Sequence, residues 1–289
     1  MFTTTLPVPD PPEAPVDAAL APRMIADYQV VRSLGEGNHG HYYLARPPER
    51  LGLDEEFVTL KVFGDRVAEQ AYDRGVRELR AFAAVRSAHL VRVYDAVLED
   101  TFVYATEHFP LGSLAAPARP LSRAEVLAAL EHTARAAHAL HEAGMAHGDI
   151  TPANVSLSEE PDGTVGGKLS DLGLARFLTP GNTMTGMGRP SSVEFTDPDI
   201  LAGAVPSRRT EVWSLGATAH RALVGTGLYG ELPDSQPLLA IRRVLAKPAQ
   251  VDPALTEGDG ALVRDCLAAG DARLATAEQV AERLAALPR

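Results

Sequence analysis

Two segments decide the fold and function of this chain: His147-Gly148-Asp149-Ile150-Thr151-Pro152-Ala153-Asn154, and Lys168-Leu169-Ser170-Asp171-Leu172-Gly173. They place two aspartates and an asparagine on predicted loops next to short apolar runs. Packing alone would not favour polar side chains at these positions, because a polar group that is buried without a hydrogen-bond partner loses its hydration at a cost in free energy. An aspartate can orient an attacking hydroxyl, and carboxylate and amide oxygens are ligands for Mg²⁺. The two segments therefore predict a site for phosphoryl chemistry.

A glycine-rich segment lies far upstream, where Gly35, Gly37 and Gly40 form the pattern G-x-G-x-x-G between two strand-like runs. Glycines in this pattern let the backbone approach phosphate groups closely. The same pattern also marks dinucleotide-binding folds, in which it opens a helix. Here residues 41–46 continue as a strand, which favours a strand-loop-strand flap.

Lys61 stands alone among apolar and β-branched residues in the predicted strand 57–63. A lysine in such surroundings needs an anionic partner, because an unpaired buried ammonium is costly. Glu78 is a suitable partner on the predicted helix 67–85. In isolation, Lys61 would be an edge-strand charge and Glu78 one solvated carboxylate among many. The order of glycine flap, lysine and glutamate favours the functional interpretation.

The hydrophobic pattern changes at Pro110, Leu111 and Gly112. Before this break the pattern indicates strands and one helix, and after it the period is mostly that of a helix. A capping box from Ser122 to Glu125 opens the first helix beyond the break. The expected strands are 28–45, 57–63, 90–98, 102–108, 155–157 and 168–170, and the chain from residue 209 onward is expected to be helical. This order predicts an α+β fold with a strand-rich first lobe and a helical second lobe.

Composition and charge restrict the functional classes. The chain has 289 residues, a hydrophobic content of 45% and a formal net charge of -11, which argues against nucleic acid as a partner. The single cysteine, Cys266, cannot form an internal disulfide and suits a reducing cytoplasm. No stretch approaches the roughly 18 to 20 apolar residues of a membrane span. Residues 1–22 are rich in proline and are expected to form a disordered leader.

The motif set, in this order, resembles the eukaryotic-like Ser/Thr protein kinases of bacteria, from about Tyr28 to the end of the chain. The resemblance implies a bilobal protein kinase-like domain over residues 23–289, with an N-lobe at about 23–109 and a C-lobe at about 110–289. It implies ATP and Mg²⁺ or Mn²⁺ as cofactors, and proteins, this chain included, as substrates and partners. The implied reaction transfers the γ-phosphoryl group to Ser or Thr hydroxyls.

The same resemblance assigns roles to individual residues. Asp149 matches the catalytic-loop aspartate, and Lys61 with Glu78 matches the ion pair that serves the same reaction. Asn154 and Asp171 match the metal ligands. Residues 106–109 resemble the gatekeeper and hinge, whose backbone would pair with adenine. The nucleotide-binding positions correspond to Leu34, Gly35, Glu36, Gly37, Gly40, Tyr42, Lys61, Glu107 and Phe109.

Two residues of the catalytic loop depart from the family pattern. Gly148 stands where most of these kinases have an arginine that couples an activation-loop phosphate to the loop, so we expect activity independent of that switch. Thr151 replaces a lysine that helps to hold the γ-phosphate, so we expect slow turnover. Thr183 and Thr185 remain candidates for phosphorylation. Ser192 falls where the family has a threonine that buttresses the catalytic aspartate, which implies Ser/Thr specificity.

Later matches concern mainly the fold. Asp199 sits where the family's activation segment ends in a glutamate, and Arg273 matches a late arginine, which implies an ion pair between them. His132, His138 and His141 share one predicted helix, but no cysteine or acidic ligand accompanies them at zinc-site spacing. We expect these histidines to be solvated.

Two other functions stay open. A pseudokinase would bind nucleotide or a partner and act as a scaffold or allosteric subunit, and Thr151 is its best support. A small-molecule phosphotransferase of the aminoglycoside or choline kinase kind would also carry His-Gly-Asp with a later asparagine, and Gly148 and Thr151 favour it. The sequence names neither the substrate, nor the regulator, nor the oligomeric state.

Overall fold

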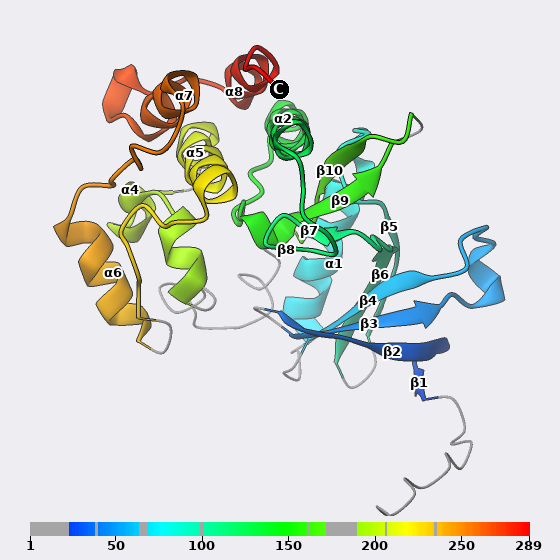
Figure 1. Cartoon of the computed structure of the whole chain (residues 1–289). Coiled ribbons are helices and arrows are strands. Elements are labelled where there is room, and N and C mark those ends of the chain that lie inside the picture. The colour runs from blue at the N-terminus through cyan, green and yellow to red at the C-terminus, as the bar shows by residue number, and fades with distance from the viewer. Residues whose placement is uncertain are drawn as a thin grey trace, which may run out of the picture.

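A computed structural model shows a strand-rich lobe and a helical lobe, which the chain connects just after β6 (Figure 1). The structure describes residues 23–37, 40–63, 69–98, 101–160, 162–171, 190–205, 207–233 and 236–289. The expected leader, residues 1–22, lies outside these ranges. Among the described helices, none is both long and apolar enough to cross a membrane. The predicted α+β, bilobal architecture is confirmed.

A six-stranded antiparallel sheet forms the first lobe, with the order β1-β2-β3-β4-β6-β5. β2 and β3 form a hairpin that ends where Gly37 pairs with Gly40. Residues 41–46 therefore continue as a strand, as the sequence predicts. The strands are β1 (Met24–Ile25), β2 (Tyr28–Gly37), β3 (Gly40–Arg46), β4 (Val58–Phe63), β5 (Val93–Leu98) and β6 (Phe102–Glu107). The one long helix among the described residues of this lobe is α1 (Glu69–Ala84), within the predicted range.

The register of the central strands places three side chains in one row. Tyr42 on β3 lies opposite Lys61 on β4, and Lys61 lies opposite Tyr104 on β6. Side chains of directly opposite residues project from the same face of a sheet. Tyr42, Lys61 and Tyr104 therefore present their polar ends on one side of the N-lobe sheet.

A smaller four-stranded sheet, with the order β10-β9-β7-β8, begins the second lobe. Its strands are β7 (Gly112–Ser113), β8 (Ala116–Pro117), β9 (Val155–Glu159) and β10 (Val165–Leu169). β9 and β10 overlap the two expected strands 155–157 and 168–170, and they pair as an antiparallel hairpin. Asn154 comes directly before β9, and Asp171 follows shortly after β10. The hairpin thus holds these two polar residues near the same end of the sheet.

Helices make up the rest of the second lobe, and most of them begin at a residue whose side chain caps the helix. The Ser122 hydroxyl accepts a hydrogen bond from the Glu125 amide, and the Glu125 carboxylate accepts one from the Ser122 amide, which confirms the predicted capping box. A second box, which the sequence analysis missed, joins Ser207 and Thr210. The helices are α2 (Arg123–Glu142), α4 (Pro198–Leu201), α5 (Arg208–Val224), α6 (Pro237–Ala246), α7 (Glu257–Leu267) and α8 (Ala277–Ala285).

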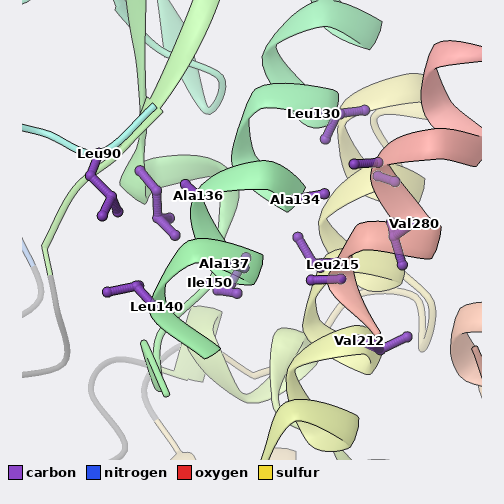
Figure 2. Packing of buried hydrophobic residues seen from close by; sticks show 14 of the residues in the cluster. Leu90, Leu130, Ala134, Ala136, Ala137, Leu140, Ile150, Val212, Leu215 and Val280 are labelled. Atoms are coloured by element: carbon purple, nitrogen blue, oxygen red, sulfur yellow. The ribbon is translucent and has the colours of Figure 1, made fainter. Parts of the chain in front are cut away.

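One apolar core extends through both lobes. In the C-lobe, Ala134 of α2, Leu215 of α5 and Val280 of α8 pack together (Figure 2). The same cluster continues to Phe102 and Tyr104 of the N-lobe sheet. Burying each large apolar side chain stabilises a fold by roughly 1.5 to 3 kcal/mol. This shared core fixes the row of the N-lobe sheet against the loops around β9 and β10.

Candidate active site

The row of Tyr42, Lys61 and Tyr104 meets Asp171 where the two lobes join. The Lys61 ammonium lies 3.0 Å from Asp171 Oδ1. The Tyr104 hydroxyl also donates to Oδ1, and the Tyr42 hydroxyl donates to Oδ2. Lys61 is only 5% exposed, so it depends on this partner. A buried ion pair is tolerated only where geometry and further hydrogen bonds offset the lost hydration, and the two hydroxyls supply those bonds.

Three aromatic rings surround the Lys61 ammonium. Its Nζ atom lies 5.2 Å from the ring centroid of Tyr42, 5.3 Å from that of Phe63 and 5.9 Å from that of Tyr104. A cation at about this distance from an aromatic face is attracted by the ring quadrupole. The rings therefore stabilise the charged lysine and restrict it to the side of the sheet that faces Asp171.

The charge state of Asp171 follows from these neighbours. Burial raises the pKa of its carboxyl, but the Lys61 ammonium and the hydroxyls of Tyr104 and Tyr42 lower that pKa further, and the net shift is downward. Burial and the Asp171 charge raise the pKa of both tyrosines well above the ordinary phenol value. At neutral pH Asp171 is therefore a carboxylate, and both tyrosines are hydrogen-bond donors.

The catalytic loop holds Asp149 and Asn154 together. A short 3-10 turn, Pro152–Asn154, carries the asparagine back toward the aspartate. Asn154 Nδ2 donates to the Asp149 backbone oxygen at 2.7 Å and to its Oδ2 at 2.9 Å. Both partners are acceptors, so the nitrogen of the amide must face Asp149. The amide oxygen of Asn154 is then the atom that remains for a metal ion.

Hydrogen bonds to Ser170 and to α5 anchor the catalytic loop to the core. Nε2 of His147 hydrogen-bonds the Ser170 carbonyl at 2.9 Å, which ties the loop to the residue before Asp171. The Gly148 amide donates to the carboxylate of Glu211 on α5. Thr218, also on α5, donates to the Ile150 carbonyl at 3.2 Å. These bonds fix the backbone on both sides of Asp149.

His141 corrects one expectation from the sequence. It is 1% exposed, not solvated, and its Nε2 lies 2.7 Å from the Glu211 carboxylate. Burial raises the pKa of Glu211, but the bond from His141 and the neighbouring His147 lower it further, so the net shift is downward. The other two histidines of α2 are partly exposed, and His132 stacks on His89 with ring centroids 4.0 Å apart. The expectation failed because α2 is central to the lobe and is buried on several sides.

A second correction concerns Arg273. Its guanidinium pairs with Asp197 and not with Asp199, as the sequence match implied. Asp197 is the N-cap of α4, and its side chain is 1% exposed. Asp199 lies in the first turn of that helix and is exposed. Only the capping position points inward, so it receives the buried arginine.

This pairing leads to a testable difference between two neighbouring aspartates. Asp197→Asn should destabilise the fold by roughly 3 to 5 kcal/mol, because it leaves the Arg273 guanidinium buried without a countercharge. Asp199→Asn is the matched control and should change stability by less than about 0.5 kcal/mol. Urea unfolding of both variants measures the difference. Equal losses would show that the buried pair is not the one described.

The flap and hinge positions are mostly described. Leu34, Gly35, Glu36 and Gly37 lie on β2, and Gly40 opens β3. At the hinge, the Glu107 carboxylate accepts from the Arg92 amide and from Lys168 Nζ, each at 2.7 Å. The Lys168 ammonium lies 5.8 Å from the ring centroid of Phe109. Glu107 thus links β6 to β10, and the expected contact of the hinge backbone with adenine stays a prediction.

Several predicted residues lie outside the described part of the chain. Glu78 belongs to α1, but its side chain is not described, so its pairing with Lys61 stays a prediction. The same holds for Leu172, Gly173, Thr183, Thr185 and the side chains of Ser191 and Ser192.

A small pocket adjoins Asp149. It has a volume of about 20 Å³, and Gly148, Thr151 and Thr196 are among its lining residues. Thr151 is 4% exposed, and within the described residues its hydroxyl has no hydrogen-bond partner. The volume is enough for one water molecule. Thr151 thus brings a neutral hydroxyl, and no positive charge, next to the aspartate.

The residues present fit a divalent cation that is bound mainly through phosphate. Within the described ranges, no group of three or more His, Cys, Asp or Glu side chains could hold a metal ion alone. Mg²⁺ in phosphoryl-transfer sites typically uses one or two protein ligands together with phosphate oxygens and water. Asn154 and Asp171 supply such a set, because backbone contacts join Asn154 to Ser170, next to Asp171.

The sequence analysis missed three residues of this arrangement. Tyr104 was read only as part of a strand, although its place opposite Lys61 in the strand register would have indicated it. Glu211 lies in the stretch from residue 209 that is expected only to be helical, and His141 is expected to be solvated. No local pattern reveals the last two, because their contacts join segments that are distant in the sequence.

Comparison with known proteins agrees with this geometry. The model of the protein kinase domain family matches residues 28–282. The chain is 30% identical over 233 residues to the serine/threonine-protein kinase PknK of Mycobacterium tuberculosis, covering 77% of this chain and 20% of that protein. It is 31% identical over 208 residues to PknJ of the same organism, covering 70% and 34%. Human cyclin-dependent kinase 20 is 29% identical over 239 residues, covering 80% and 66%. The chain thus spans a fifth of the PknK protein and about a third of PknJ.

Proposed function

The chain belongs to the protein kinase family, and from this premise we propose that it transfers the γ-phosphoryl group of ATP to Ser or Thr hydroxyls of proteins. We further propose that Mg²⁺ or Mn²⁺ is required, that the chain itself can be a substrate, and that it acts in the cytoplasm. The observation that carries the proposal is the arrangement of four residues in one site. Asn154 hydrogen-bonds Asp149, and Lys61 pairs with Asp171. The hydrogen bond between His147 and the Ser170 carbonyl holds these two pairs together.

The roles of the residues follow from their chemistry. Asp149 would accept a hydrogen bond from the substrate hydroxyl and orient it toward the γ-phosphorus. Asn154 and Asp171 would hold the metal ion, which neutralises phosphate charge when it is bound. Lys61 would bind phosphate oxygens from the N-lobe side. The glycines of the flap would let backbone amides approach the same phosphates.

Two further properties are proposed from the departures in the catalytic loop. Gly148 has no side chain to bind an activation-loop phosphate, and its amide is held by Glu211. We therefore expect activity without prior phosphorylation. Thr151 brings no positive charge to the transferred group, so we expect slow turnover. A scaffold or a small-molecule phosphotransferase is the alternative if no protein hydroxyl is phosphorylated.

The first test is phosphoryl transfer by the full chain from labelled ATP, with Mg²⁺ or Mn²⁺ and with excess chelator. We expect label on Ser or Thr of the chain or of an added basic protein only with the metal ion. Treatment with a phosphatase, followed by its removal, should leave the initial rate unchanged. No transfer, with measurable nucleotide binding, would reject the kinase in favour of a scaffold or a small-molecule enzyme. A rate that returns only after a lag would contradict independence from phosphorylation.

A further inference from the structure

We propose that Tyr42 and Tyr104 are positioning residues that restrict Asp171 to binding a divalent cation through a single oxygen, and so favour Mg²⁺ and Mn²⁺ over Ca²⁺. This inference rests on the proposed function, because it takes Asp171 as a metal ligand. It goes further by assigning a role in metal selection to two tyrosines of the N-lobe sheet.

The argument begins with the lone pairs of the Asp171 carboxylate. An ionised carboxylate offers about four acceptor sites, two on each oxygen. Oδ1 accepts from the Tyr104 hydroxyl and from the Lys61 ammonium at 3.0 Å. Oδ2 accepts from the Tyr42 hydroxyl. The described residues therefore use three of these sites, and the one that they leave is on Oδ2.

The two hydroxyls are held in place by the sheet. Tyr42 and Tyr104 flank Lys61 in the row of paired residues across β3, β4 and β6. Tyr104 is 4% exposed, and its ring centroid lies 6.0 Å from that of Phe63 and 6.1 Å from that of Phe102. A ring packed in this way cannot turn its hydroxyl away without leaving the core. The hydroxyl of Tyr104 is therefore a fixed donor to Oδ1.

Monodentate binding discriminates between the common divalent cations. Ca²⁺ takes six to eight oxygen ligands at 2.3–2.6 Å and often binds a carboxylate through both oxygens. Mg²⁺ requires a near-octahedral shell at 2.0–2.1 Å and is bound by one or two carboxylates together with phosphate oxygens. An Asp171 whose Oδ1 is occupied cannot give Ca²⁺ its second oxygen. No cluster of three His, Cys, Asp or Glu side chains in the described ranges could replace it.

The test measures cation binding directly and needs no catalytic turnover. Mn²⁺ is titrated into the full chain with ADP present, and unbound Mn²⁺ is followed by electron paramagnetic resonance. Mg²⁺ and Ca²⁺ then compete, and the ratio of their competition constants is compared among variants. Tyr104→Phe and Tyr42→Phe each remove one hydroxyl and keep the ring. Tyr28→Phe is the matched control. The Tyr28 side chain is buried, and its hydroxyl donates at 2.7 Å to Asp95, a carboxylate of the N-lobe that is not part of the proposed metal site.

We expect Tyr104→Phe to shift the ratio toward Ca²⁺ by roughly three- to tenfold, the range that one hydrogen bond of ordinary strength implies, because it frees a site on Oδ1. Tyr42→Phe leaves Oδ1 occupied and should shift the ratio by less. The control should leave the ratio unchanged. A general loss of folded protein lowers the amount of bound Mn²⁺ but does not alter the ratio. Asp171→Asn should bind no Mn²⁺ that Mg²⁺ or Ca²⁺ could displace, and this result would locate the ion at Asp171.

The outcomes separate this inference from the function on which it rests. If the wild-type chain binds Mn²⁺ and Asp171→Asn does not, but the ratio stays the same in both tyrosine variants, then the positioning role is wrong and the proposed metal site stands. If Mn²⁺ binds equally well to Asp171→Asn, the ion lies elsewhere and the inference is overturned. If the wild type binds no Mn²⁺ with ADP, the proposed metal dependence fails as well.

Discussion

Asp149→Asn is expected to lower the rate of phosphoryl transfer by roughly 10² to 10⁴-fold, the range found when a positioned general base is removed. Asparagine has nearly the same shape, and its side-chain oxygen can still accept the hydrogen bond that Asn154 Nδ2 now gives to the carboxylate at 2.9 Å. The loop should therefore keep its conformation while the negative charge that orients the substrate hydroxyl is lost. Initial rates at saturating ATP measure the loss, and thermal unfolding checks the fold.

Asp54→Asn provides the matched control, because Asp54 is an exposed aspartate of the N-lobe. It should leave both the rate and the unfolding temperature unchanged. Transfer by Asp149→Asn at more than about a tenth of the wild-type rate would show that the hydroxyl is oriented by another group. That result would contradict the assignment of Asp149 even if the chain is a kinase.

Lys61→Met is expected to abolish measurable transfer and to destabilise the folded chain by about 3 kcal/mol at pH 7. The stability loss arises because Asp171, whose side chain is 15% exposed, loses its ammonium partner. Methionine retains the apolar part of the side chain, so little packing volume is lost. Urea unfolding measures the free energy, and Lys247→Met is the control because Lys247 is exposed. Equal stability of Lys61→Met and the wild type would contradict the buried pair.

The pH dependence of this variant provides a separate test. In the folded chain the pKa of Asp171 is raised by burial but lowered more by Lys61, Tyr104 and Tyr42, so it lies below the value of about 3.9 in an unfolded chain. The ionised group therefore stabilises the fold above that pH, and the contribution is lost as the pH falls through the folded pKa. Without Lys61 the pKa should rise. The stability difference between wild type and Lys61→Met should thus be larger at pH 7 than at pH 4.

The sequence was sufficient where chemistry is carried by local patterns. The flap was predicted as strand-loop-strand because residues 41–46 read as a strand, and Gly37 and Gly40 do pair across the hairpin. Lys61 was predicted to need an anion because it stands among apolar residues. Its described partner is Asp171, which the sequence analysis had assigned to the metal ion alone. The spacing of residues along the sequence could not reveal the contact between Lys61 and Asp171, because the two residues belong to different lobes.

The sequence was insufficient where burial depends on the whole lobe. His141 was expected to be solvated because a helix with one apolar face usually exposes the other. His141 itself is buried in the last turn of α2, where its Nε2 bonds the Glu211 carboxylate. The partner of Arg273 was predicted to be Asp199 and is Asp197, for a related reason. Only Asp197, the N-cap of α4, points into the core. Both errors concern polar residues whose environment is set by packing.

The Glu211 carboxylate has a consequence for how this chain can change over generations. It bonds both the Gly148 amide, 63 residues earlier in the sequence, and His141, 70 residues earlier. A lineage that loses the histidine keeps a buried carboxylate with one donor fewer, which lowers the stability of the fold around the loop that carries Asp149. Mutations at positions 141 and 211 are therefore not independent, and descendants that retain the site should inherit compatible residues at both.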